Sequence, residues 1–155
     1  MSFAPTSPIT GAAVAGFTSP TYTLTADTPP NANSKQYAVS ALGGTQTGVD
    51  VNAVSKPFTH TMMRPVVLKP LPQANVSTGV VPNIPTNRYD ILTRKGAVPA
   101  ANQVPALIRI RTVVEVPAGT DAYEPEELKA AWSSHVGMLS ANSSAICDVF
   151  VTGVL

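Results

Sequence analysis

The stretch "ALIRIRTVVEV", residues 106–116, is the clearest strand pattern in the chain and decides how the rest is interpreted. It is almost entirely β-branched or aliphatic, apart from Arg109, Arg111 and Glu115. Successive side chains of a strand point to opposite faces, so one face carries Ile108, Ile110, Thr112, Val114 and Val116. The other face carries Leu107, Arg109, Arg111, Val113 and Glu115. Burying an unpaired arginine is costly, so this second face must meet water, acids or phosphate.

Shorter runs of alternating polarity precede this strand and predict an antiparallel sheet of about five to six strands. The runs lie at residues 21–27, 35–42, 47–54 and 58–69. We interpret Gly43-Gly44 as a turn after the second run. Pro65 within the last run implies an edge position or a bulge.

Two proline-rich segments lack this periodicity. Residues 1–20 predict an extended arm. Residues 70–105 predict a long ordered loop with at most a short strand at 89–92, and loops this long in a compact domain are usually functional.

After residue 116 the apolar spacing changes to that of a helix. Leu128, Trp132, Val136 and Leu139 form one apolar stripe over residues 124–142. Residues 145–155 fit either a second helix or a final strand. We therefore expect one α+β domain over residues 1–155, with the sheet over 21–116 and the helices over 124–155. One such helix cannot cover both faces of a sheet this wide, which leaves a burial problem.

Composition excludes several classes of protein. The 155 residues suffice for one domain, and the single Cys147 allows neither an intrachain disulfide nor a cysteine-based zinc site. We interpret Cys147 as a buried apolar residue, with an intersubunit disulfide as the alternative. The start of the chain lacks the charged segment of a signal peptide, and no apolar run reaches the roughly 20 residues of a membrane span. We expect a soluble protein made in a reducing cytoplasm.

The charges are unevenly distributed. Residues 1–111 hold nine of the ten Lys and Arg residues against three acids, a balance of +6, whereas residues 112–155 hold one lysine against six acids, a balance of −5. This asymmetry indicates a basic surface for a polyanion, with chance distribution over a solvated surface as the alternative.

Catalytic and metal-binding motifs are not found in the sequence. His60 and His135 have no second ligand at metal-binding spacing, and no serine stands in a G-x-S-x-G setting. "LGGTQTG" (42–48) lacks the lysine of a P-loop and is typical of a hairpin turn. We expect no enzyme activity, cofactor, metal or small-molecule substrate.

The order of elements from "HTMMRPVVLKP" (60–70) to "RIRTVVEVPAGTDAYEPEELKAAWSSHVGMLSANSSAICDVFVTGVL" (109–155) resembles the coat proteins of single-stranded RNA bacteriophages, the leviviruses. "IRTV" leading into "ELKAAWSSH" is most similar to the branch typified by the Acinetobacter-phage coat protein. The resemblance is specific over about 105–155 and weak over 58–69.

The resemblance implies an intertwined homodimer in which two sheets join edge to edge and each subunit's helices lie on the partner's sheet. The implied interface residues are Leu128, Trp132, Val136, Leu139, Ile108, Ile110 and Val114. Dimers would build an icosahedral shell in the virion, with the 70–105 loop making dimer–dimer contacts, and the protein would be made in the bacterial host cytoplasm.

The opposite face of the sheet would line the shell and bind genomic RNA, including a translational-operator hairpin. The implied RNA-binding residues are Arg109, Arg111, Arg64, His60, Lys56 and Lys69. The Lys/Thr/Tyr/Asn set of well-known members is not reproduced, so hairpin specificity cannot be carried over. Three alternatives remain: a salt bridge from the arginines to Glu115 or Asp90, a non-viral dimeric RNA-hairpin regulator, and a surface or fimbrial-type β protein.

Overall fold

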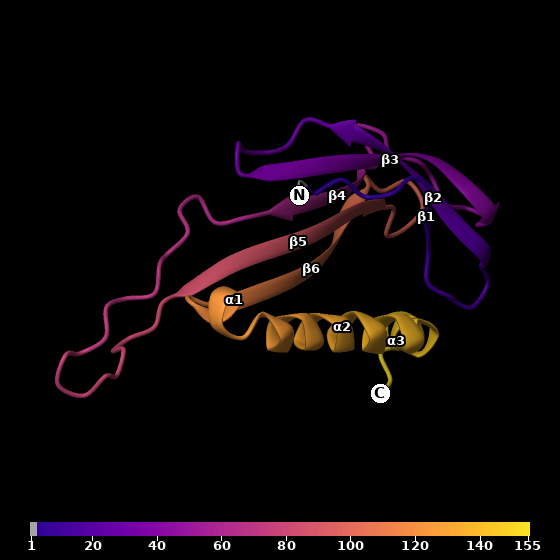
Figure 1. Ribbon diagram of the computed structural model, residues 1–155. Helices are drawn as coiled ribbons and strands as arrows, with labels where there is room; N and C mark the ends of the chain where they lie inside the picture. Colours follow the sequence, from indigo (N-terminus) through magenta and orange to yellow (C-terminus); the bar gives the residue numbers. More distant parts are fainter. Residues whose placement is uncertain (1–2) are drawn as a thin grey trace.

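The computed structural model describes residues 3–155 and contains one six-stranded antiparallel sheet followed by three helices (Figure 1). The strands are β1 (Ile9–Thr10), β2 (Thr18–Asp27), β3 (Ser34–Thr45), β4 (Phe58–Met63), β5 (Thr86–Ala97) and β6 (Ala106–Pro117). They lie side by side in chain order, and each is antiparallel to the next. The helices are α1 (Thr120–Tyr123), α2 (Pro125–Ala141) and α3 (Ser143–Thr152). The α+β fold predicted from the sequence is confirmed.

The strand predicted from "ALIRIRTVVEV" is β6, and it pairs along its whole length with β5. The prediction of a single loop over 70–105 is wrong, because β5 is a continuous 12-residue strand inside it. Charged residues at positions 88, 90, 94 and 95 hide its apolar alternation, and pairing with β4 and β6 supplies the order that the local pattern lacks. The loop is therefore two connections, residues 64–85 and residues 98–105.

Two other strand predictions and one turn prediction also need correction. The strand predicted over 58–69 ends at Met63, ahead of Pro65, whose nitrogen cannot donate to a ladder. Residues 47–54 form no strand. Gly43 and Gly44 lie inside β3 rather than in a turn. At Gly44 the φ angle is +71°, and a Cβ would collide with the Ser19 backbone, where β2 is irregular.

The N-terminal segment is not the extended arm that was predicted over 1–20. Beyond residues 1–2, which lie outside the described chain, it folds back as β1 and pairs with β2. Gly11 N–H donates to the Pro20 carbonyl at 2.8 Å, and the Phe3 ring packs edge-on against Tyr37 at 5.9 Å between centroids. This hairpin makes one edge of the sheet, while β6 makes the other.

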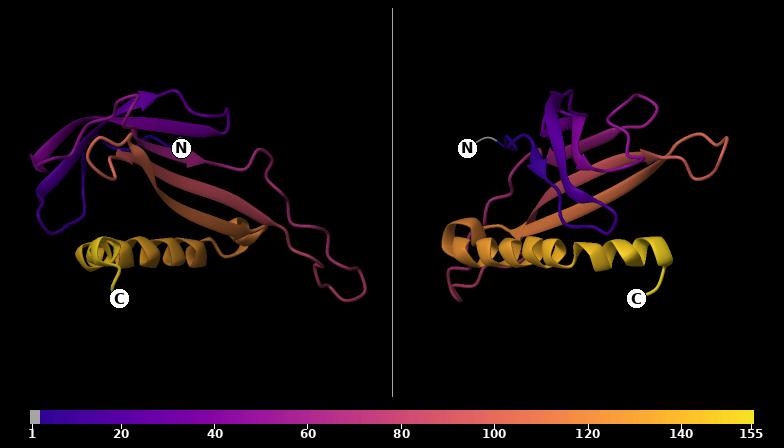
Figure 2. Two further views of the ribbon diagram at one scale, coloured as in Figure 1. Left: turned by 180° about the vertical axis from the view of Figure 1, so that it is seen from behind. Right: turned by 90° about the vertical axis from the view of Figure 1, so that its right-hand side faces the viewer.

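The C-terminal helices form a layer set apart from the sheet (Figure 2). Residues 145–152 are helical, which decides between the two alternatives left open by the sequence. The 17-residue helix α2 has no buried residue, and its main contacts are with α1 and α3 rather than with a strand. Among residues 3–155, the buried hydrophobic side chains are Val39, Phe58, Val116 and Ala118. No helix in this part of the chain is long and apolar enough to cross a membrane.

Candidate nucleic-acid and subunit interfaces

The register of the strands assigns each sequence-predicted residue to one side of the sheet. We call the side that carries Ile108, Ile110, Thr112, Val114 and Val116 the helix face, because Val114 and Val116 share a cavity with Leu128 and Trp132 of α2. We call the opposite side, which carries Arg109 and Arg111, the open face.

Four arginines lie on the open face of two neighbouring strands. Arg94 of β5 is opposite Arg109 of β6, Leu92 is opposite Arg111, and Arg88 is opposite Glu115. Sequence reasoning missed Arg88 and Arg94, since both lie in the segment interpreted as a loop. Their even spacing with Asp90 and Leu92 was the available signal, because alternate residues of a strand share a face.

Asp90 holds two of these arginines together. Its Oδ1 accepts a hydrogen bond from Arg111 Nε at 2.9 Å and one from an Arg88 terminal nitrogen at 3.3 Å. The hydrogen bond from Arg111 is the main reason that the pKa of Asp90 lies below its usual range, and the same bond raises the pKa of Arg111. The alternative of a salt bridge to Asp90 is therefore found for Arg111.

The other two arginines differ in their surroundings. Arg94 donates to Gln36 Oε1 and Thr59 Oγ1, both at 3.1 Å, and this orients its guanidinium along the sheet. Arg109 has neither a hydrogen bond nor an ion pair within residues 3–155, and Glu115 likewise has none there. Arg109 is therefore the guanidinium most available to an anion from outside the subunit.

The placement of His60 on the same face as the arginines is wrong. His60 is opposite Thr93, which is opposite Ile110, so its side chain lies on the helix face. Nδ1 is 2.9 Å from Thr93 Oγ1, Nε2 is buried with no partner in the described chain, and burial lowers the pKa of the imidazole. Parity along β4 alone could not reveal this, because the face of each residue depends on the register with β5.

The remaining predicted RNA-binding cations lie at the ends of strands. Arg64 follows β4 and lines a cavity of about 300 Å³ together with Lys69, Arg88 and Asp90. Lys69 is held through its backbone, which exchanges two hydrogen bonds with the Asn87 side chain. Lys56 forms a 2.7 Å ion pair with Asp50. The structure therefore brings Arg64 and Lys69 near Arg88, and leaves Lys56 paired elsewhere.

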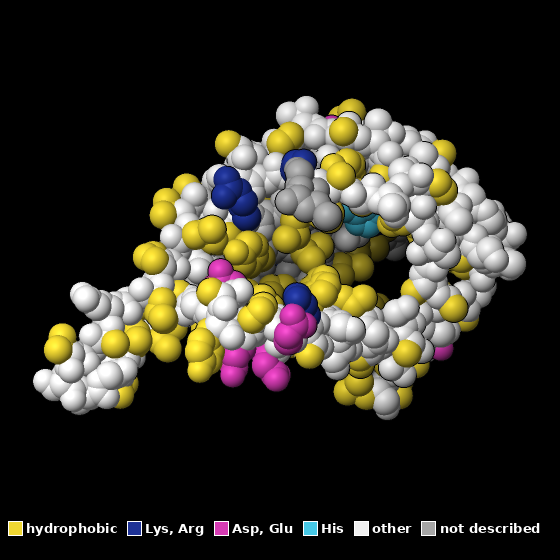
Figure 3. Space-filling view, in the orientation of Figure 1, with side chains coloured by type: hydrophobic (Ala, Val, Ile, Leu, Met, Phe, Trp, Pro, Cys, Tyr) yellow, Lys and Arg dark blue, Asp and Glu magenta, His cyan; other side chains and the backbone are white. Residues whose placement is uncertain are grey.

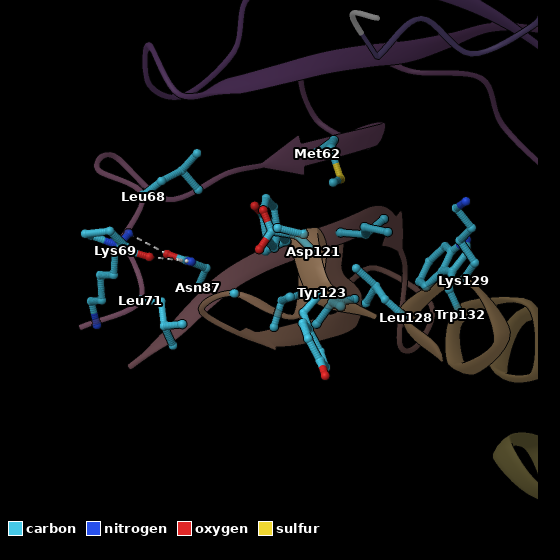
Figure 4. Close-up of a pocket in the computed structure, with 17 residues that line it drawn as sticks. Met62, Leu68, Lys69, Leu71, Asn87, Asp121, Tyr123, Leu128, Lys129 and Trp132 are labelled. Atoms are coloured by element: carbon cyan, nitrogen blue, oxygen red, sulfur yellow. Dashed lines mark hydrogen bonds between the residues drawn. The ribbon is translucent and has the colours of Figure 1, made fainter. Parts of the chain in front are cut away.

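The seven predicted interface residues all border the space between the sheet and the helix layer or lie exposed beside it. Leu128, Trp132 and Val114 line an apolar cavity of about 880 Å³ (Figure 4). In the space-filling view, hydrophobic side chains surround the hollow between the sheet and the helix layer (Figure 3). The other four are at least 38% exposed: Val136, Leu139, Ile108 and Ile110.

The accessible surface of the chain is larger than that of a compact monomer of the same mass. The accessible area is 10696 Å², whereas a compact monomer of 16.1 kDa is expected to expose about 7,400 Å². The excess of about 3,300 Å² for one subunit is larger than the roughly 1,000–2,500 Å² that each partner of an obligate interface buries. This chain therefore has the surface of a component of a larger assembly.

Other chemistry is sparse in the described residues. Cys147 has a free thiol and is partly exposed, so the prediction that it is buried is wrong within one subunit. No group of three or more His, Cys, Asp or Glu side chains in residues 3–155 is arranged to hold a metal ion.

A six-stranded antiparallel sheet with a separate, uncovered C-terminal helix layer defines a subunit of a coat-protein type. Among solved structures, the chain is similar to the subunit of the virus-like particle of bacteriophage ESE020, with 49% sequence identity and a TM-score of 0.96 over 99% of this chain and 100% of that one. It shares its fold with the subunit of the virus-like particle of Beihai levi-like virus 32, with 15% identity and a TM-score of 0.50 over 86% and 88% of the two chains. No family model and no curated protein matches the chain. The chain belongs to the family of levivirus-type coat proteins.

Proposed function

We propose that this coat protein forms an intertwined homodimer and that dimers assemble into an icosahedral shell around single-stranded RNA. In the dimer, the helices of each subunit cross over and cover the helix face of the partner. The carrying observation is that α2 has no buried residue while the helix face opposite it exposes Ile108 and Ile110 by 50% and 58%. The apolar side of α2 and the helix face of the sheet are both buried when α2 of a second subunit packs against this sheet, and this burial stabilises the dimer.

The two sheets of the dimer join through β6. In the described chain, no strand pairs with the outer side of this 12-residue strand, and the opposite edge of the sheet is the two-residue β1. A long strand edge with free N–H and C=O groups is a template for pairing with another strand. Two subunits would thus form one continuous sheet of twice the width.

The shell is supported by the similarity to the ESE020 subunit, whose structure is that of a virus-like particle. The connection over residues 64–85 projects from the body of the subunit (Figure 1) and exposes Val66, Val76 and Val80 by 63% or more. Apolar side chains on a projecting segment favour contact with a neighbouring subunit. We therefore assign the dimer–dimer contacts to residues 64–85. The resemblance found in the sequence places them instead in a single loop over residues 70–105.

The RNA lies against the open face, where Arg88, Arg94, Arg109 and Arg111 concentrate positive charge. Guanidinium groups bind phosphate oxygens through paired N–H donors and stack on unpaired bases. Arg64 and Lys69 extend this surface at one end. The same face would also bind a translational-operator hairpin of the RNA. The mature protein resides in the virion after synthesis in the bacterial cytoplasm.

Expression of the full chain in bacteria tests the assembly. We expect nuclease-resistant particles of a few hundred ångströms in electron micrographs, and RNA in the particles after nuclease treatment. Small soluble species under several assembly conditions would contradict the shell. Empty particles would contradict the RNA role and leave the shell standing.

A further inference from the structure

We propose that the two β6 strands of the dimer pair in one register, with Thr112 opposite Thr112 of the partner subunit. In this register Arg109 of each subunit forms an ion pair with Glu115 of the partner subunit. The inference rests on the dimer proposed above, and it adds the residues that decide how the two sheets align.

The symmetry of the dimer limits the possible registers. A two-fold axis perpendicular to the sheet keeps the open faces of both subunits on the same side. Residues directly opposite each other must then lie on the same face of the sheet, so a residue always faces another of its own parity. The partner strand can therefore shift only by two residues at a time. Two registers pair all but one residue of each 12-residue strand. One is centred on Arg111 and the other on Thr112.

The open face favours the register centred on Thr112. Centring on Arg111 places two guanidinium groups directly opposite each other, which is destabilising across strands. Centring on Thr112 instead places Arg109 opposite Glu115 of the partner subunit, and the symmetry makes this pair twice. Arg111 is then opposite Val113 of the partner subunit, and its ion pair with Asp90 is kept.

The helix face favours the same register. With Thr112 at the centre, Ile110 is opposite Val114 of the partner subunit and Ile108 is opposite Val116 of the partner subunit. With Arg111 at the centre, Ile110 is opposite a threonine instead. Pairs of β-branched aliphatic side chains pack better across strands than a mixed pair does. Both faces of β6 therefore select one alignment.

The subunit itself leaves this ion pair unmade. Arg109 and Glu115 have no partner within residues 3–155, and the cross-strand neighbour of Arg109 is another cation, Arg94. Glu115 is opposite Arg88, whose guanidinium bonds to Asp90 instead. In one chain, positions 109 and 115 are about 20 Å apart along the strand, too far for an ion pair.

A charge-swap cycle tests the register on RNA-free dimers. The variants are Arg109→Glu, Glu115→Arg and the double swap, and the measurement is the dimer dissociation constant from concentration-dependent unfolding in urea. We expect each single variant to weaken the dimer about 3- to 30-fold and the double swap to restore it to within about threefold. Because the two positions are remote within one chain, coupling between them reports contact across the dimer. A stable dimer with no coupling overturns the register.

Cysteine cross-linking provides a second readout in a Cys147→Ser background. A thiol opposite its own copy across the axis lies within disulfide distance, whereas a diagonal pair does not. We expect Thr112→Cys to form the cross-linked dimer faster than Arg111→Cys. Equal or faster cross-linking of Arg111→Cys overturns the register. A monomer at every protein concentration, seen by sedimentation of the unmodified chain, instead overturns the dimer itself.

Discussion

Asp90 on β5 accepts a 2.9 Å hydrogen bond from Arg111 on β6, which places a carboxylate among the four arginines of the open face. The Asp90 side chain is only 14% exposed, and a second bond from Arg88 shares the same oxygen. The acid orients two guanidinium groups and cancels part of their charge. It therefore limits how strongly this face attracts a polyanion.

Replacing Asp90 by Asn should increase the affinity of the dimer for single-stranded RNA and steepen its salt dependence. The substitution removes one negative charge next to Arg88 and Arg111 and keeps the shape of the side chain. Filter binding at several salt concentrations measures both effects. Asp50→Asn is the matched control, because it removes the same charge from the Lys56 ion pair. Equal effects of the two variants would indicate a response to net charge alone.

The double variant Arg109→Ala with Arg111→Ala should fold and still dimerise at assembly concentrations, more weakly because the Arg109–Glu115 pair is lost, and the particles should package less RNA. The slope of log affinity against log salt should become shallower by about 0.7 for each phosphate contact that is lost on single-stranded RNA. The ratio of absorbance at 260 to that at 280 nm reports the RNA content of purified particles. Lys129→Ala serves as the control, since Lys129 lies on α2 and pairs with Glu126. Unchanged RNA uptake would remove the two arginines from the proposed interface.

Truncating Trp132 should destabilise the dimer by about 2–4 kcal/mol, close to the cost of removing a buried aromatic side chain. Within one subunit Trp132 is 41% exposed, so a monomer would lose much less. Concentration-dependent urea unfolding of Trp132→Ala and Trp132→Phe measures the difference, and the Phe variant should retain most of the stability. The chain has a single tryptophan, so its emission should also shift to longer wavelength when the dimer dissociates. An Ala variant as stable as the unmodified chain would contradict burial under the partner.

The protein should lose stability as the pH falls below about 6.5, the ordinary value for histidine in the unfolded chain. Burial lowers the pKa of His60 in the folded state, so the unfolded state binds more protons between the two values and stability rises with pH across that window. The loss is at most about 1.4 kcal/mol per pH unit for each chain, and it stops once the pH is below the lowered pKa.

Replacing His60 by Gln should flatten this pH dependence, as measured by urea unfolding between pH 5 and pH 7.5. His135→Gln is the control, because the His135 side chain is exposed within one subunit and lies outside the sheet. If the pH dependence disappears in His135→Gln and remains in His60→Gln, the assignment of the effect to His60 is wrong.

The sequence alone determined the strand at 106–116 and the helix within 124–142, and the order of its elements indicated the family by resemblance. These came from local patterns: the period-two alternation of β6 and the helical spacing of Leu128, Trp132 and Val136 are written in neighbouring residues. The opposite characters of the two faces of β6 could likewise be deduced from alternation alone.

Only the tertiary structure decided the rest. The full length of β5 was not recognised beyond the short strand expected at 89–92, and His60 could not be assigned to a face, because both depend on pairing with strands far away in the chain. The same holds for Arg88 and Arg94, which join Arg109 and Arg111 only through the pairing of β5 with β6. Local sequence encodes which way side chains alternate, whereas long-range hydrogen bonding decides which alternating sets share a surface.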